Sequence, residues 1–254
     1  MPRIDINCDL GEGFGVYEVG QDERVFPLIT SANVACGFHA GDPVIMQRSV
    51  ELAIRHRVSI GAHPGTPDLL GFGRRRMDLE SQEIESLLIY QIGAIETMAR
   101  AHGAVMRHVK PHGWLYNEAA RNLDLARVIA RAVKKVSPRL VLFGLSGSFL
   151  IRAAEEEGLP FAREAFVDRA YLEDGTLAPR SRPGAVITNP DRAANQALRI
   201  AQAKEVICLQ HEEIHVAADT LCVHGDNPEV LRVLREVRKV LGQHQIQISA
   251  FEPT

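Results

Sequence analysis

The feature that most constrains the fold of this chain is an alternation of short strand-like runs with longer amphipathic segments of helical period. Between most of the runs, apolar residues return every three or four positions. The strand-like runs cover residues 3–7, 31–35, 59–62, 105–109, 140–145, 161–165, 206–209 and 221–223. This alternation is typical of parallel strands joined by crossover helices, so the sequence predicts an α/β fold.

We expect one domain over residues 1–254, because nothing in the chain indicates a boundary. There is no repeat of fixed period, no low-complexity tract and no Pro- or Ser-rich linker. A closed (β/α) barrel commonly uses about this length as one unit. We therefore predict a TIM-like barrel of seven or eight strands. Residues 185–188 could form a further short strand, which leaves the strand count uncertain by one.

Three helix starts are indicated by a capping side chain followed by proline, at residues 42–43, 189–190 and 227–228. The longest helical pattern runs from about residue 79 to residue 102, and Gly103 is suited to end it. These helices provide the crossovers that a parallel sheet requires.

Charge and cysteine content exclude several classes of protein. With 29 basic and 32 acidic side chains the net charge is -3, which favours neither nucleic-acid nor anionic-membrane binding. Neither a signal peptide nor an apolar run long enough to span a bilayer is present, so we expect a cytoplasmic protein. The four cysteines form no Cys-x-x-Cys pair, and we expect them to be reduced.

Titratable residues follow most of the predicted strands. In a parallel barrel the carboxyl ends of the strands share one face, so these residues should meet there and support acid-base chemistry or metal binding. The simpler alternative is that loops are polar because they face water. Glycine and proline beside the polar residues favour fixed loops, and the residues concerned are Asn7, Asp9, Glu12, His39, Asp42, His63, Lys110, His112, Glu164, Asp168, Arg169, His224 and Asp226.

Six long segments in order resemble the LamB/YcsF family over nearly the whole chain. They are IDINCDLGEGFG (4–15), SANVACGFHAGDP (31–43), GAHPGTPDLLGFGRR (61–75), HVKPHGWLYN (108–117), REAFVDRAYLEDGTLAPR (163–180) and CVHGDNP (222–228). The resemblance implies a barrel of the glycoside hydrolase/deacetylase superfamily. It also implies an ATP-dependent 5-oxoprolinase activity, in which this chain works with partner subunits B and C to convert 5-oxo-L-proline to L-glutamate.

The motif positions carried over from the resemblance fall into two groups. We expect a catalytic group made of Asp9, His39, His63, Lys110 and His112. We expect a substrate-binding group made of Asn7, Glu12, Asn33, Glu164, Asp168, Arg169, His224 and Asp226. A histidine or carboxylate would act as the base toward water, and a cation would stabilise the developing negative charge and hold the substrate carboxylate.

We expect ATP as a co-substrate. The sequence leaves open whether a divalent metal also binds. Asp9, His39 and His63 follow three successive strands and resemble the Asp/His/His set of barrel deacetylases, which is suited to zinc. A metal-free hydrogen-bonded cluster is the alternative. No G-x-x-x-x-G-K-[ST] motif is present, so the nucleotide could bind another subunit.

Residues 211–215 spell H-E-x-x-H, the motif of zinc proteases, which requires both histidines on one helix. A strand-like run precedes the motif and no helical pattern follows, so we expect an exposed loop or hairpin instead. Two other functions remain as alternatives: a stand-alone metal-dependent amidohydrolase or deacetylase, and a non-catalytic lactam-binding subunit.

Overall fold

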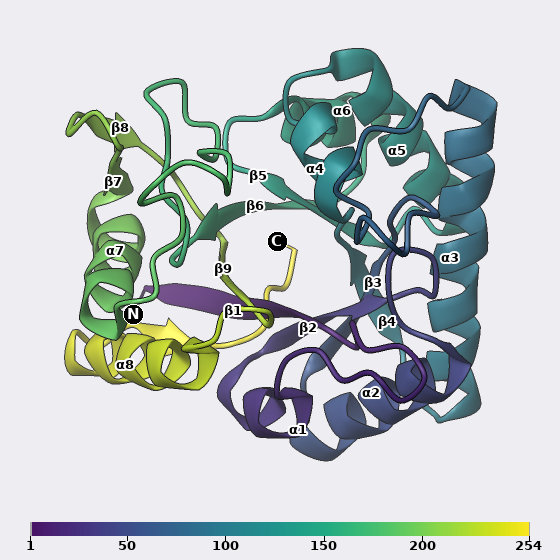
Figure 1. Ribbon diagram of the computed structural model, residues 1–254, viewed down its shortest axis with the longest axis horizontal. Helices are drawn as coiled ribbons and strands as arrows, with labels where there is room; N and C mark the ends of the chain where they lie inside the picture. The colour runs from purple at the N-terminus through teal and green to yellow at the C-terminus, as the bar shows by residue number, and fades with distance from the viewer. Residues whose placement is uncertain (1, 254) are drawn as a thin grey trace.

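The computed structural model describes residues 2–253. Its centre is a ring of parallel strands, with the helices outside it (Figure 1). The ring strands are β1 (Arg3–Leu10), β2 (Ser31–Ala35), β3 (Ser59–His63), β4 (Met106–Val109), β5 (Val141–Leu145), β6 (Phe161–Phe166) and β9 (Thr220–His224). The predicted α/β barrel is confirmed, with seven strands.

The ring closes because β1 pairs in parallel with both β2 and β9. In that register Asp9 lies opposite Asn33 on one side and opposite His224 on the other. On the next strand pair, Ala35 lies opposite His63. The strand ends that carry the predicted polar residues are therefore level with one another at one rim.

The helices surround the ring and supply the crossovers. They are α1 (Asp22–Val25), α2 (Pro43–His56), α3 (Ser81–Ala101), α4 (Gly113–Ala119), α5 (Leu123–Val136), α6 (Phe149–Glu157), α7 (Pro190–Ala203) and α8 (Val230–Gln243), with a 3-10 turn, η1 (Phe26–Leu28). Within residues 2–253, every helix is too short or too polar to cross a lipid bilayer.

Two of the three predicted helix starts are confirmed by their caps. Asp42 accepts hydrogen bonds from the first turn of α2, and Asn189 does so for α7. The third start is wrong, because α8 begins at Val230 after Glu229. Asn227 instead accepts a hydrogen bond from the backbone of Glu229 and donates to Asp168, so it serves the loop before the helix.

The alternation along β1 separates two environments. Ile4, Ile6 and two further even-numbered residues pack into the large core between strands and helices. Burying each large apolar side chain stabilises the fold by about 1.5–3 kcal/mol. Asp5, Asn7 and Asp9 alternate with them and contact polar side chains of other ring strands, so they point into the ring. The apolar core therefore lies outside the ring, and much of the interior is polar.

The floor of the ring is closed by a separate apolar cluster and the C-terminal tail. Val141, Phe143 and Ala162 form this cluster, and Phe251 packs against it with its ring centroid 6.5 Å from that of Phe143. A short strand, β10 (Gln247–Ile248), pairs with β1 and leads the tail there. In Figure 1 the yellow tail turns into the middle of the ring. No strand was expected at β10 from the sequence.

One predicted strand lies outside the barrel. Residues 206–209 overlap β7 (Glu205–Ile207), which pairs antiparallel with β8 (Glu213–His215) as a separate two-stranded sheet. Residues 185–188 form no strand and make only an isolated bridge between Val186 and Arg169. The ring therefore has seven strands, because residues 206–209 form a local hairpin outside it and residues 185–188 add no strand. All four cysteines are buried and unpaired.

Candidate active site

A pocket of 460 Å³ opens at the rim where the ring strands end. Aromatic side chains, among them Trp114 and Phe166, form part of its wall. The predicted site residues that line it are Asp9, His63, Lys110, His112, Arg169 and His224. The remaining predicted residues lie beneath or beside this pocket, and each is placed below.

Lys110 lies at the base of the pocket between two carboxylates. Its Nζ is 2.9 Å from Asp9 Oδ1 and 2.8 Å from Glu164 Oε1, and the ammonium is nearly inaccessible to water. Burial disfavours the charged form, but the carboxylates of Asp9 and Glu164 outweigh it and raise the pKa of Lys110 well above its usual value. The pocket therefore holds a fixed cation.

The carboxylate of Asp9 is held in its charged form by the same contacts. Burial alone would raise its pKa, but His63 and Lys110 hold the pKa of Asp9 well below its usual range. Asn33 donates a further hydrogen bond to Asp9 Oδ1 at 2.8 Å. Asn7 and Asn33 themselves are fully buried below the pocket, bonded to each other.

Tyr116 and Cys222 join this cluster and were missed in the sequence. The hydroxyl of Tyr116 donates to Glu164 Oε2 at 2.5 Å. The Cys222 sulfur lies 3.1 Å from Lys110 Nζ. Tyr116 lies six residues after Lys110, one turn into α4, and Cys222 points into the ring from β9. Only the fold brings either of them to Lys110.

Three histidines and Glu12 form a second cluster beside Asp9. The rings of His39 and His112 are stacked in parallel with centroids 3.7 Å apart. His63 Nε2 faces His112 Nδ1 at 2.9 Å. Glu12 Oε1 lies 3.5 Å from His39 Nε2 and 3.6 Å from His112 Nδ1. One ligand atom from each of the four residues lies within 4.8 Å of every other.

The hydrogen bonds of His63 and His112 determine which nitrogens carry lone pairs. His63 Nδ1 lies 2.7 Å from the carbonyl oxygen of Lys110, and His112 Nε2 lies 2.8 Å from that of Phe72. A carbonyl oxygen only accepts, so both of these nitrogens are protonated. In the neutral rings the two nitrogens that face each other at 2.9 Å therefore both carry lone pairs, an arrangement that requires a proton or a cation between them.

His39 provides an independent sign that the cluster fits a cation. The ring is completely buried, and within the described residues neither of its nitrogens has a hydrogen-bond partner. Burial and the neighbouring His63 lower the pKa of His39 well below its usual value, so the imidazole is neutral and able to coordinate. Buried polar atoms without a partner are rare in proteins, and three imidazoles with one carboxylate suit zinc.

Glycines make room for the stacked rings. A Cβ atom at Gly65 would lie 2.5 Å from His39 Nδ1. A Cβ atom at Gly73 would lie 2.7 Å from His39 Cβ and 2.9 Å from His112 Cδ2, and Gly73 also has a φ of +61°. The segment between β3 and α3 thus brings its backbone close to the histidine cluster at Gly65 and Gly73, and the Phe72 ring packs edge-on against His39 and His112, with centroids 5.7 and 5.3 Å away.

The other predicted acids at the rim are engaged in pairs. Asp168 accepts from the backbone nitrogen and from Nδ1 of His224, at 3.0 and 2.9 Å. Asp226 forms ion pairs with Arg74 at 2.7 Å and with Arg180 at 3.3 Å. Both acids hold loops and cations around the pocket without lining it, and neither arginine was singled out in the sequence.

Arg169 is a buried guanidinium that donates to backbone carbonyl oxygens. Its Nη2 donates to the carbonyl oxygen of Ala178 at 2.6 Å, and its Nε donates to that of Ala185 at 3.3 Å. No carboxylate among residues 2–253 forms an ion pair with it. Burial and the nearby Arg180 lower the pKa of Arg169 to about 10, which leaves it charged at neutral pH. The pocket therefore offers an unneutralised cation in its wall.

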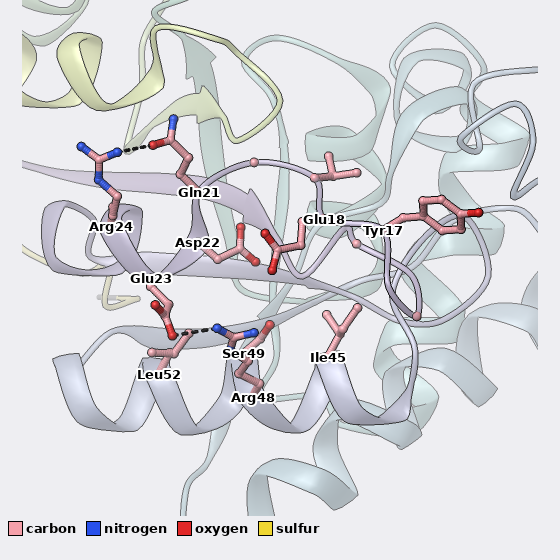
Figure 2. A pocket seen from close by; sticks show the side chains of 14 residues that line it. Tyr17, Glu18, Gln21, Asp22, Glu23, Arg24, Ile45, Arg48, Ser49 and Leu52 are labelled. Atoms are coloured by element: carbon pink, nitrogen blue, oxygen red, sulfur yellow. Dashed lines mark hydrogen bonds and ion pairs between the residues drawn. The ribbon is translucent and has the colours of Figure 1, made fainter.

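A second hollow, of 280 Å³, lies between the loop after β1 and helices α1 and α2 (Figure 2). Figure 2 shows Arg48 paired with Glu23, and Gln21 bonded to Arg24, at its surface. None of the predicted site residues lines it. Asp22, in its wall, accepts from the backbone nitrogen of Gly11 at 2.8 Å. This hydrogen bond of Asp22 therefore holds the loop that carries Glu12.

The H-E-x-x-H segment is not part of the site. Residues 213–215 form β8 in the hairpin with β7, and His211 and His215 are exposed. The expectation of a hairpin is confirmed, and the two histidines do not share a helical face.

Known proteins are similar to this chain over nearly its whole length. The 5-oxoprolinase A subunit of Geobacillus thermodenitrificans is 50% identical over 251 residues, covering 99% of this chain and 98% of that protein. The crystal structure of a lactam utilization protein from Thermus thermophilus is 46% identical, with a TM-score of 0.93, and covers 98% of this chain and 100% of that one.

A more distant structure supports the fold class alone. The catalytic domain of a peptidoglycan N-acetylglucosamine deacetylase from Eubacterium rectale is 9% identical, with a TM-score of 0.52 over 99% of this chain and 89% of that one. The sequence model of the LamB/YcsF family matches residues 4–254. The chain therefore belongs to the LamB/YcsF family.

Proposed function

We propose that this chain is the A subunit of a 5-oxoprolinase and that its pocket opens the lactam ring of 5-oxo-L-proline to give L-glutamate. The observation that carries the proposal is the buried Lys110, held between Asp9 and Glu164 at the base of the pocket beside the histidine cluster. Relatives about 50% identical over the whole chain bear the name of the 5-oxoprolinase A subunit, which implies a complex with further subunits.

Arg169 is suited to hold the carboxylate of the substrate. Its guanidinium lines the pocket and is fixed by the carbonyl oxygens of Ala178 and Ala185, so it presents its remaining N–H groups without an internal acid. Hydrogen bonds between a guanidinium and a carboxylate are among the strong ones in proteins. A lactam that carries a carboxylate should therefore bind better than one that lacks it.

Ring opening requires attack of water on the lactam carbonyl carbon and cleavage of its bond to nitrogen. The new C–O bond becomes part of the side-chain carboxylate of glutamate, and the nitrogen gains a proton to become its amino group. Asp9 lies where a base could take the proton from water, and its Oδ2 is 3.5 Å from His63 Nε2. Lys110 supplies the positive charge that stabilises the oxygen of the transition state.

We propose that ATP activates the amide by phosphorylating its oxygen with release of ADP, so that attack of water and cleavage of the C–N bond leave γ-glutamyl phosphate, which a second water molecule hydrolyses to glutamate and phosphate. We also propose that one of the partner subunits B and C binds the nucleotide. The chain has no P-loop motif, and the pocket is lined by groups suited to a small lactam. The four donors Glu12, His39, His63 and His112 would hold a divalent cation such as zinc. When bound, it would polarise an oxygen or lower the pKa of a water molecule.

The test of the function is reconstitution with subunits B and C, with glutamate release measured with and without ATP. We expect ATP-dependent release that is lost in Asp9→Ala, His63→Ala and Lys110→Ala, while the surface variant Lys134→Ala keeps wild-type activity. Full activity of all three site variants would contradict the proposal.

The test of the metal is elemental analysis of protein purified without chelators or a histidine tag. We expect bound divalent metal in the wild type and in the surface variant His244→Ala, and its loss in His39→Ala. Metal-free wild-type protein that is fully active in the complex would contradict the metal site.

A second function, a stand-alone metal-dependent amidohydrolase or deacetylase, is favoured by the metal-suited cluster. It predicts amide hydrolysis by this chain alone, without ATP. A non-catalytic lactam-binding subunit instead predicts 5-oxo-L-proline binding, with no change in rate when Asp9 or His63 is replaced. The reconstitution assay separates the three.

A further inference from the structure

A layer of amide and hydroxyl side chains fills the ring directly below Asp9 and Lys110. Asn33 Nδ2 donates to Asp9 Oδ1 and to Asn7 Oδ1, each at 2.8 Å. Asn7 Nδ2 donates in turn to Thr220 Oγ1 at 2.8 Å and to Glu164 Oε1 at 2.9 Å. These bonds join residues of four strands.

The hydrogen bonds of this layer form one chain, in which each residue donates to the next. Thr220 receives its bond from Asn7 and gives its own hydroxyl proton to Asp5. The chain of hydrogen bonds therefore ends at a carboxylate on the Asp5 side. At the other end of this chain of hydrogen bonds, Asn33 Oδ1 lies 2.8 Å from His108 Nε2. The chain therefore begins at the His108 imidazole.

The orientation of the Asn33 amide determines the protonation of His108. If the amide were turned over, its oxygen would face the oxygens of Asp9 and Asn7, both at 2.8 Å. Asn33 Oδ1 must therefore face His108, and His108 must donate from Nε2. Burial and Lys110 lower the pKa of His108 to about 3, so the ring is neutral and its one N–H is on Nε2.

The His108 ring is held in one position by the residues around it. The ring is almost completely buried and lies stacked on Phe143, with centroids 4.2 Å apart and an angle of 13° between the planes. On β3, Gly61 faces the ring, and a Cβ atom there would overlap the imidazole. No other residue type fits at position 61 while His108 keeps this place.

We propose that His108 is a positioning residue for the site: its Nε2–H holds the Asn33 amide at its oxygen and thereby keeps the Asp9 carboxylate aimed at Lys110 and His63. Without this donor Asn33 Oδ1 is left buried without this hydrogen bond, and the amide can shift beneath Asp9. The Asp9 carboxylate would then be held less firmly toward its partners. The predicted change in rate rests on the proposed ring-opening function, whereas the predicted geometry does not.

The kinetic test compares two replacements of similar size in the reconstituted complex. His108→Met removes the N–H, and His108→Gln places an amide N–H near the position of Nε2. We expect kcat to fall about 10- to 100-fold in His108→Met, the usual loss for a second-layer partner of an active site. KM for 5-oxo-L-proline should stay near wild type, because Arg169 is untouched.

We expect His108→Gln to recover most of the lost kcat, and the surface control His244→Gln to match wild type. Wild-type kcat in His108→Met would overturn the proposal. An equal loss in both His108 variants at equal melting temperature would also overturn it, because the donor would then not be what matters.

A spectroscopic test decides the geometry whether or not the complex opens the lactam and whether or not His108→Met folds. In wild-type protein labelled with ¹⁵N-histidine, we expect the imidazole signal that disappears in His108→Gln to be that of a neutral Nε2–H form at neutral pH. A neutral Nδ1–H form or a protonated ring at this position would overturn the proposal independently of any assay.

Discussion

Lys110 is the residue at which stability and chemistry depend on the same contacts. Its ammonium separates the buried carboxylates of Asp9 and Glu164. Lys110→Met would leave two acids in the ring without their cation, and breaking a buried pair in this way costs about 3–5 kcal/mol. We expect a loss of that size in urea unfolding, together with loss of activity.

The matched control is Lys239→Met on α8, where the exposed lysine pairs with Glu236 one turn away. Such a surface pair contributes little to stability, because water screens both charges. Equal losses of unfolding free energy in the two variants would show that the buried pairs contribute no more than a surface pair.

Asp5 makes stability depend on pH. Burial, opposed by hydrogen bonds from Thr220, Thr30 and Ser31, raises its pKa from 3.8 to about 6. The folded protein therefore binds this proton more tightly than the unfolded chain. The contribution of Asp5 to the free energy of unfolding is largest below the ordinary pKa and falls by about 3 kcal/mol as pH rises to about 6.

Asp5→Asn should remove that fall, as measured by urea unfolding at a series of pH values. Asp124→Asn is the control, because the Asp124 carboxylate is 95% exposed and meets water in both states. A pH dependence in Asp5→Asn as steep as that of the wild type would rule out Asp5 as its source.

Single residues also show where sequence reasoning stops. Asp9, His63 and Lys110 could be predicted because they end strands and lie in motifs with glycine and proline. His108 and Tyr116 belong to the same motif but were not selected. Within a strand or a helix, a polar residue looks like any other until the register shows whether it faces the ring or water.

At the scale of elements, the segment between β3 and α3 is fixed by the rings beneath it. Gly73→Ala adds a methyl group in a left-handed conformation against His39 and His112. Gly175→Ala adds one at a similar φ of +79° but with no atom within 4 Å. The backbone penalty, about 1–2 kcal/mol, is common to both.

We therefore expect Gly175→Ala to lose only that amount and to keep wild-type activity, whereas Gly73→Ala loses more stability and most activity. Thermal unfolding and the glutamate assay provide the measurements. Equal behaviour of the two variants would mean that the histidine stack tolerates displacement.

The elements of the barrel could be predicted because apolar periodicity and crossover order are local in sequence. The strand at 206–209 was misplaced because a short apolar run fits a barrel strand and a hairpin equally well. Its partner, β8, lies only a few residues away, so a local antiparallel pairing forms outside the ring. The strand β10 escaped prediction because two residues carry no periodicity.

At the scale of the whole molecule, the tail closes the ring on the side away from the pocket. Phe251 is partly buried against Val141, Phe143 and Ala162. Phe251→Ala should lower the free energy of unfolding by about 2 kcal/mol, below the range for fully buried phenylalanine. Activity of the folded protein should be retained, since Phe251 packs on the floor of the ring. A large fall in kcat without loss of stability would contradict this separation of floor and rim.

The polar interior of the ring has a consequence for the order of events during synthesis. Asn7, on the first ring strand, depends on Thr220 and Glu164 for its partners, and Lys110 depends on Cys222 as well as on Asp9. A ribosome-bound chain that ends before β9 can place helices against six strands, yet it has neither a closed ring nor an aligned lysine. The site can therefore form only after β9, the last ring strand, has been synthesised and pairs with β1.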